Sequence, residues 1–180
     1  MKRIKTLAVL GFLCGLLLPS MLSCKKNSNE LPVEFQLRVL DTLGIEKSVF
    51  TQGENIVFSF LVVNNSTKDI LLENFLPNDE LFMLYQFVSN EELVPYGKPY
   101  DAICETGLFA IPAKGSLEFK CPWVSSENTN YYGYCLGITS NSPSNTLLPM
   151  GNFITSFSSA FKIDDIQTEV QHFEVKFSVK

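Results

Sequence analysis

An alternation of apolar and polar side chains, with a period of two residues, constrains the fold of this chain more than any other feature. Side chains that alternate in this way lie on opposite faces of a β-strand, so one face can be buried. Residues 55–63 (NIVFSFLVV) are apolar almost throughout, which is typical of a central strand. In residues 33–43 the apolar positions mostly share one parity: Val33, Phe35, Leu37, Val39 and Leu43.

Six further segments have the composition of short strands, and turn-forming residues separate them. After the signal-like N-terminus no segment shows a helical periodicity, and residues 89–106 are interpreted as a long loop. Seven to nine strands of uneven length predict an all-β fold, an antiparallel β-sandwich rather than a barrel. The six segments are residues 69–72, 81–88, 116–123, 131–139, 153–161 and 171–179.

Phenylalanine is abundant, with 15 residues, and falls repeatedly on one parity of the later strands. Because side chains of one parity share a face of a strand, these positions predict two facing layers of a single core. The predicted core positions are Leu117, Phe119, Cys121, Trp123, Phe153, Thr155, Phe157, Phe161, Phe173, Val175, Phe177 and Val179.

The first 23 residues have the composition of a bacterial secretion signal. Three of the first five residues are basic, and residues 7–18 form an apolar run too short to span a bilayer. Leu22 and Ser23 precede Cys24 in a pattern that resembles the lipobox of bacterial lipoproteins. The resemblance implies cleavage before Cys24 and lipidation of its sulfur. An uncleaved membrane anchor and an ordinary secretion signal are the alternatives.

This pattern predicts three parts: a signal peptide (1–23), a lipidated cysteine with a polar tether (24–32), and one domain (33–180). Two or three acyl chains would hold the protein stably on a membrane without spanning it. We expect the outer membrane of a cell envelope, on its periplasmic or its surface-exposed face.

The charge balance of the expected mature protein argues against nucleic acid as a partner. The signal holds three of the 14 basic residues, so 11 basic residues remain against 19 acidic ones, a formal charge of −8. Nucleic-acid binding depends on clustered Lys and Arg, which this chain lacks. About 150 residues suit a single domain with its own core.

Three cysteines of the expected mature domain can be either paired in a disulfide or reduced. Cys14 leaves with the signal and Cys24 takes lipid, so Cys104, Cys121 and Cys135 would enter an oxidising compartment. Cys121 has core parity and Cys135 has the opposite parity to its apolar neighbours, which disfavours a bridge between them. Cys104 could pair with either, and three reduced thiols are the other reading.

The single histidine limits the chemistry available to the chain. His172 shares the solvent-facing parity of Glu174 and Lys176, and no nucleophile motif accompanies it. No pair of cysteines has metal-ligand spacing. We therefore expect no catalytic residues, no metal and no cofactor.

Three segments resemble the immunoglobulin-like domain of the intracellular proteinase inhibitor (BsuPI) family. They are a strand that ends in Asn (residues 53–72), a Pro-x-x-Gly turn before a strand that ends in Trp (111–123), and a Gly/Tyr-rich strand (131–138). The resemblance implies an immunoglobulin-like sandwich and, more weakly, protease inhibition.

The favoured function is a non-catalytic binding or accessory module, anchored by lipid, that presents loops to a protein or glycan partner. The candidate loops are residues 94–100 and 128–132, because tyrosine suits both kinds of recognition. The alternative for each tyrosine is that it covers an end of the sandwich. The candidate side chains are Tyr96, Lys98, Tyr100, Tyr131 and Tyr132.

Two other functions remain open on the sequence. A protease inhibitor would offer a rigid loop, for which residues 104–106 braced by a disulfide are the candidate. A structural envelope lipoprotein would pair by strand addition, for which residues 55–63 are the candidate edge strand.

Overall fold

The computed structural model describes residues 32–73, 80–89, 92–99, 102–103, 108–124, 136–137 and 146–180. All of them belong to one compact unit, Leu31–Lys180. Within these ranges the chain forms strands and no helix; nine strands have four residues or more and five have two. The signal peptide, Cys24 and most of the predicted tether lie outside the described residues.

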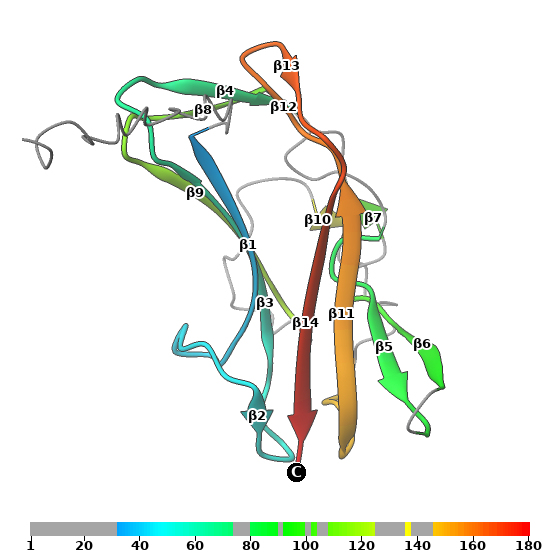
Figure 1. Cartoon of the computed structure of the whole chain (residues 1–180). Helices are drawn as coiled ribbons and strands as arrows, with labels where there is room; N and C mark the ends of the chain where they lie inside the picture. Colours follow the sequence, from blue (N-terminus) through cyan, green and yellow to red (C-terminus); the bar gives the residue numbers. More distant parts are fainter. Residues whose placement is uncertain are drawn as a thin grey trace, which may run out of the picture. The chain divides into compact units, whose positions relative to one another are not determined.

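One sheet, the three-stranded sheet, has the order β1-β3-β9 and is antiparallel throughout. It consists of β1 (Val33–Leu40), β3 (Val57–Asn64) and β9 (Ser116–Pro122). The predicted central position of residues 55–63 is confirmed, since β3 hydrogen-bonds to a strand on each side (Figure 1). The prediction that the same residues form a free edge is wrong for that reason.

A second sheet, the five-stranded sheet, has the order β2-β14-β11-β5-β6. Its long strands β11 (Gly151–Ser159) and β14 (Gln171–Val179) pair along their whole length and run side by side in Figure 1. The pairing is antiparallel except between β14 and β2 (Val49–Phe50), which are parallel. The other members are β5 (Leu84–Phe87) and β6 (Leu93–Gly97).

Two smaller sheets complete the described strands. The first has the order β13-β12-β4-β8, and the second pairs β10 with β7. Asp164 and Asp165 turn the β12–β13 hairpin, both with positive φ (47° and 67°), as its two-residue connection requires. The strands are β4 (Ile70–Glu73), β7 (Ala102–Ile103), β8 (Leu108–Ile111), β10 (Leu136–Gly137), β12 (Lys162–Ile163) and β13 (Ile166–Gln167).

Phenylalanine rings join the three-stranded sheet to the five-stranded sheet. The Phe60 ring of β3 lies 5.3 Å from Phe157 and 5.4 Å from Phe173, measured between ring centroids. Near the other end of β3, the Phe58 ring lies 6.2 Å from that of Phe177. Two sheets packed face to face through one apolar layer form a sandwich. The predicted all-β sandwich is therefore confirmed, and its predicted core positions are buried or partly buried within it.

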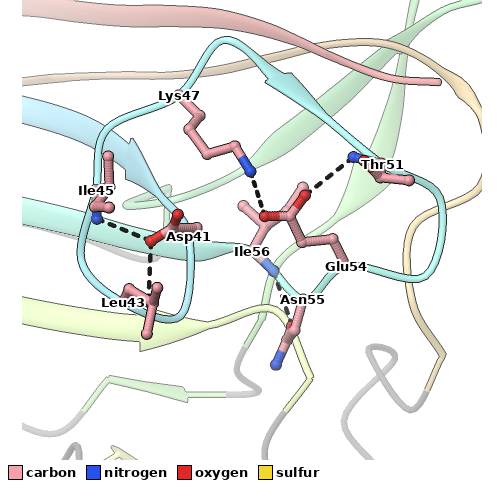
Figure 2. Close-up of polar contacts among 8 residues, drawn as sticks. All are labelled: Asp41, Leu43, Ile45, Lys47, Thr51, Glu54, Asn55 and Ile56. Atoms are coloured by element: carbon pink, nitrogen blue, oxygen red, sulfur yellow. Dashed lines mark hydrogen bonds and ion pairs between the residues drawn. The ribbon is translucent and has the colours of Figure 1, made fainter.

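The first strand is shorter than the sequence predicts. β1 ends at Leu40, because the Asp41 carboxylate accepts hydrogen bonds from the backbone amides of Leu43 and Ile45 and closes a turn (Figure 2). Gly44 follows with a φ of 82°, which favours glycine. Leu43, predicted to face the core, is instead 83% exposed.

Polar side chains also fix the entry into β3. The Glu54 carboxylate accepts hydrogen bonds from Lys47 Nζ (2.5 Å) and from the Thr51 amide (3.0 Å), as Figure 2 shows. The Lys47 hydrogen bond, followed by that of Thr51, lowers the pKa of Glu54. Asn55 bonds both the amide and the carbonyl of Val124, which ties this entry to the end of β9.

Two predictions for the middle of the chain are wrong. The predicted loop 89–106 contains β6 and β7. The predicted strand 81–88 begins only at Leu84, because Phe82 adopts a φ of 61° that no strand allows. The Phe82 ring is held there in the core, 5.6 Å from Phe58 and 5.7 Å from Phe119.

Candidate functional site

A groove of about 580 Å³ lies at one end of the five-stranded sheet. Its floor follows the strand register: Asn152 of β11 is paired with Ser178 of β14, and the Ser178 amide donates a hydrogen bond to the Ser48 carbonyl (2.9 Å). The end of β5 and the two residues after it form one wall. Its outward-facing lining is Ser48, Phe87, Val88, Ser89, Asn152, Lys176 and Ser178, and this set is called the β14 groove below.

The β14 groove combines hydrogen-bonding groups with an apolar wall. Three hydroxyls, one carboxamide and one ammonium stand beside the half-buried Phe87 and the exposed Val88. The Lys176 side chain is 66% exposed and lies 3.2 Å from the Glu174 carboxylate, which offsets its charge. The volume lies within the range of about 300–1,000 Å³ of small-molecule sites, and the lining is more polar than is usual for such sites.

The sequence predicts that some of these residues are exposed, but it does not predict that they lie together. Asn152, Lys176 and Ser178 share the solvent-facing parity of their strands, which the alternation does indicate. The groove exists because β2, β5, β11 and β14 are brought together from distant parts of the chain. No local sequence motif predicts which of these strands pair.

A row of polar side chains follows the outer face of β14 away from the groove. Ser158 Oγ lies 3.0 Å from His172 Nδ1, and His172 Nε2 lies 3.7 Å from the Glu174 carboxylate. The exposed position predicted for His172 is confirmed, since its side chain is 61% exposed. The three residue types are those of a hydrolase triad, but an open sheet face leaves water around every group. The row has the form of a cross-strand surface ladder.

The structure places the tyrosine candidates differently from the predicted loop. Tyr96 lies in β6, and its ring packs 5.8 Å from Trp123 and 5.6 Å from Phe153. It is 37% exposed, so it covers one edge of the core. Lys98 follows β6 and is half-buried. Tyr100, Tyr131 and Tyr132 lie outside the described residues.

Of the cysteine candidates, the structure describes Cys121 alone. Cys121 is a free thiol with no exposed surface, so the predicted burial is confirmed and this residue is in no disulfide. Burial raises the pKa of its thiol to about 12, which keeps it protonated and unreactive at neutral pH. Cys104 and Cys135 lie outside the described residues.

A charged network lies on the outer face of the three-stranded sheet. Glu118 Oε1 accepts hydrogen bonds from Arg38 (2.5 Å) and Ser59 (2.7 Å), and Lys120 Nζ lies 3.2 Å from Oε2. Burial acts to raise the pKa of Glu118. The hydrogen bonds from Ser59 and Lys120 and the charges of Lys120 and Arg38 outweigh burial, so the pKa is lowered.

Replacing this carboxylate, Glu118→Gln, is expected to lower the free energy of unfolding by about 1 kcal/mol at pH 7. A lowered folded-state pKa stabilises the fold above the ordinary value of 4.5, and that stabilisation disappears as pH falls through the folded-state pKa. Urea midpoints of wild type and variant should therefore converge below pH 4.5. The control is Glu169→Gln, an exposed carboxylate without an ion pair to the described residues. A difference in urea midpoint between wild type and Glu118→Gln that stays constant across pH would contradict the lowered pKa of Glu118.

Among the described residues, no three His, Cys, Asp or Glu side chains come together as ligands for a metal ion. Over the same residues there is no helix with the length and hydropathy needed to cross a bilayer.

No protein-family model matches the chain, and no curated protein matches it. Among solved structures, the chain is similar to the ASH / PapD-like domain of human CEP192 (PapD-like domain 7). The two share 11% identity over 83% of this chain and 86% of that one, with a TM-score of 0.39. It is also similar to part of a β-glucosidase from Listeria innocua, solved in complex with gluconolactone. That match has 14% identity over 81% of this chain and 16% of that chain, with a TM-score of 0.28.

Proposed function

We propose that this protein is a non-catalytic binding module, tethered to a membrane through lipid on Cys24, that binds a short polar ligand in the β14 groove. The observation that carries the proposal is the groove itself, which places five polar side chains beside an apolar wall, three of them on the paired strands β11 and β14. Binding sites built on strands hold their side chains more firmly than sites on loops.

The lining favours a glycan over a protein segment. Hydroxyl and carboxamide groups exchange hydrogen bonds with sugar hydroxyls, and a half-exposed ring such as Phe87 suits the apolar face of a sugar. Since Glu174 offsets the charge of Lys176, a neutral ligand is favoured over a strongly anionic one. A protein partner is the other outcome of the test.

The tether is proposed from the sequence. The signal-like N-terminus and Cys24 predict export and acylation, and the compact unit that begins at Leu31 leaves a short polar segment between anchor and domain. We expect the outer membrane, and its periplasmic and surface-exposed faces are both compatible with this arrangement.

The two alternatives gain no support from the described residues. The strand proposed for edge pairing, residues 55–63, lies mainly in β3, the middle strand of its sheet. The loop proposed for protease inhibition, residues 104–106, lies outside the described residues, so inhibition of the BsuPI type stays an expectation from the sequence resemblance.

The test is a glycan array and a peptide array probed with the full protein in detergent, followed by calorimetric titration of any ligand found. Asn152→Ala and Lys176→Ala are each expected to weaken binding about tenfold, since each removes one hydrogen-bonding group from the groove. The matched control is Ser156→Ala, on the same face of β11 but outside the groove, with wild-type affinity expected. Blank arrays, or groove variants that bind like wild type, would contradict the proposal.

A further inference from the structure

The outer face of the five-stranded sheet continues beyond the β14 groove, toward β5 and β6. Strands β14, β11 and β5 lie side by side in Figure 1. Tyr85 of β5 lies opposite Ile154 of β11, which in turn lies opposite Lys176 of β14. Extending the β11–β5 register by one pair places Phe87 opposite Asn152. Because Phe87, Asn152 and Lys176 line the groove, Tyr85 stands in a row of side chains that leads into it.

The part of this face that belongs to β5 and β6 is aromatic and apolar. Leu84 is in the core with no exposed surface, so the alternation along β5 turns Tyr85 and Phe87 outward. Both rings are half-buried, and residues two apart in a strand are separated by about 6.8 Å. On β6, the exposed Pro95 lies opposite Tyr85, and Leu93, which is 44% exposed, lies opposite Phe87.

We propose that Tyr85 forms a second subsite beside the β14 groove, and that the ligand is an extended, neutral, β-linked oligosaccharide that spans both. The inference rests on the proposed function, since it adds a subsite to the same groove. A sugar ring has an apolar face of C–H groups and an edge of hydroxyls. The apolar face packs on aromatic rings, and the hydroxyls exchange hydrogen bonds with carboxamide, hydroxyl and ammonium groups.

The order of apolar and polar groups favours a chain over a single sugar. Tyr85 and Phe87 follow each other along one strand, as successive rings of an extended oligosaccharide do. The Lys176 ammonium lies 3.2 Å from the Glu174 carboxylate, so the polar side of the site matches a neutral ligand. A wholly apolar partner would cover Asn152 and Lys176 without offering them hydrogen bonds, which is costly.

Calorimetric titration of the full protein, in a detergent without a sugar headgroup, tests the second subsite through chain length. The probes are cello-, manno- and chito-oligosaccharides of two to six units. We expect the affinity of at least one series to rise about tenfold from the disaccharide to the tetrasaccharide, because a further sugar ring then packs on Tyr85. Malto-oligosaccharides, which are α-linked and coil, should show no such rise.

Substitutions of Tyr85 separate stacking on a sugar from a purely structural role. Tyr85→Ala should remove the rise with chain length and leave the affinity for the disaccharide unchanged. Tyr85→Phe, which keeps a ring, is the matched control and should bind like wild type. Tyr85→Thr also removes the ring but keeps a β-branched side chain suited to a strand, so it replaces Tyr85→Ala if urea unfolding shows that the alanine variant does not fold. A ring that only covers the sheet would leave the chain-length dependence unchanged in every variant.

Failure of the second subsite is distinguishable from failure of the groove. A flat affinity across chain lengths, with binding that Asn152→Ala still weakens, would overturn the second subsite and leave the proposed function standing. A rise with chain length that survives Tyr85→Ala and Tyr85→Thr would overturn it as well. If no oligosaccharide binds, both the subsite and the glycan ligand are wrong, and a peptide that binds through Tyr85 would make this face a protein-docking surface instead.

Discussion

Replacing Asn64 with alanine is expected to lower the free energy of unfolding by about 3 kcal/mol. Asn64 is fully buried at the end of β3, and its Nδ2 donates to the carbonyl oxygens of Lys68 (2.8 Å), Ile111 (3.0 Å) and Pro112 (3.0 Å). Its Oδ1 accepts a hydrogen bond from the Ser66 amide (2.9 Å). Alanine would remove all four of these hydrogen bonds, although the Lys68 carbonyl keeps its bond from Ser66 Oγ and the Pro112 carbonyl keeps its bond from the Gly115 amide.

The matched control for this variant is its neighbour, Asn65→Ala. Asn65 is exposed, and its hydrogen bonds to the described residues are made by its backbone, so a change within about 0.5 kcal/mol is expected. Urea unfolding at pH 7 measures both. If Asn64→Ala and Asn65→Ala have equal midpoints, the side chain of Asn64 is not what joins the β3–β4 turn to the turn before β9.

Phe60→Ala is expected to have a larger effect, a loss of about 4 kcal/mol. Phe60 has no exposed surface, and its ring lies within 5.7 Å of Phe157, Phe161 and Phe173, measured between centroids. Removing the ring opens a cavity between the two sheets, in addition to the lost transfer free energy. Phe87→Ala, which truncates a half-buried ring in the wall of the β14 groove, is expected to cost less than half as much. Equal losses of unfolding free energy for Phe60→Ala and Phe87→Ala would contradict a central position of Phe60 in the core.

Much of this fold could be predicted from side-chain alternation. The predicted strand 171–179 coincides with β14, and the phenylalanine positions of β11 and β14 face the core as their parity indicates. Periodicity succeeds for such strands because one face is buried along most of their length. It fails for β2, β7, β12 and β13, since two residues are too few to show a period, whereas β10 lies within the predicted strand 131–139.

The errors have local physical causes. Pro95 and Gly97 favour a turn by composition, yet both lie in β6, an edge strand where proline removes no hydrogen bond that the sheet needs. The irregular register between Leu84 and Tyr85 accommodates this strand and turns Tyr96 toward Trp123. A tyrosine expected at a loop tip is therefore part of the packing.

The candidate site could not be predicted from the sequence, for a different reason. Its residues come from four strands and their ends, and their proximity depends on which strands pair. Alternation indicates which face of a strand is exposed, but it carries no information on neighbours. The buried role of Asn64 was hidden in the same way, because asparagine at the end of a strand also suits an exposed turn.

The packing of the two sheets against each other through phenylalanine is tested most directly by a double-mutant cycle. Phe60→Leu and Phe157→Leu are made singly and together, and unfolding free energies are measured in urea. We predict a coupling energy of about 1 kcal/mol, because the two rings are in contact across the sandwich (5.3 Å). The exposed Met150→Leu should show no coupling to Phe60→Leu. Additive effects of the Phe60 and Phe157 variants would contradict a sandwich with these sheets face to face.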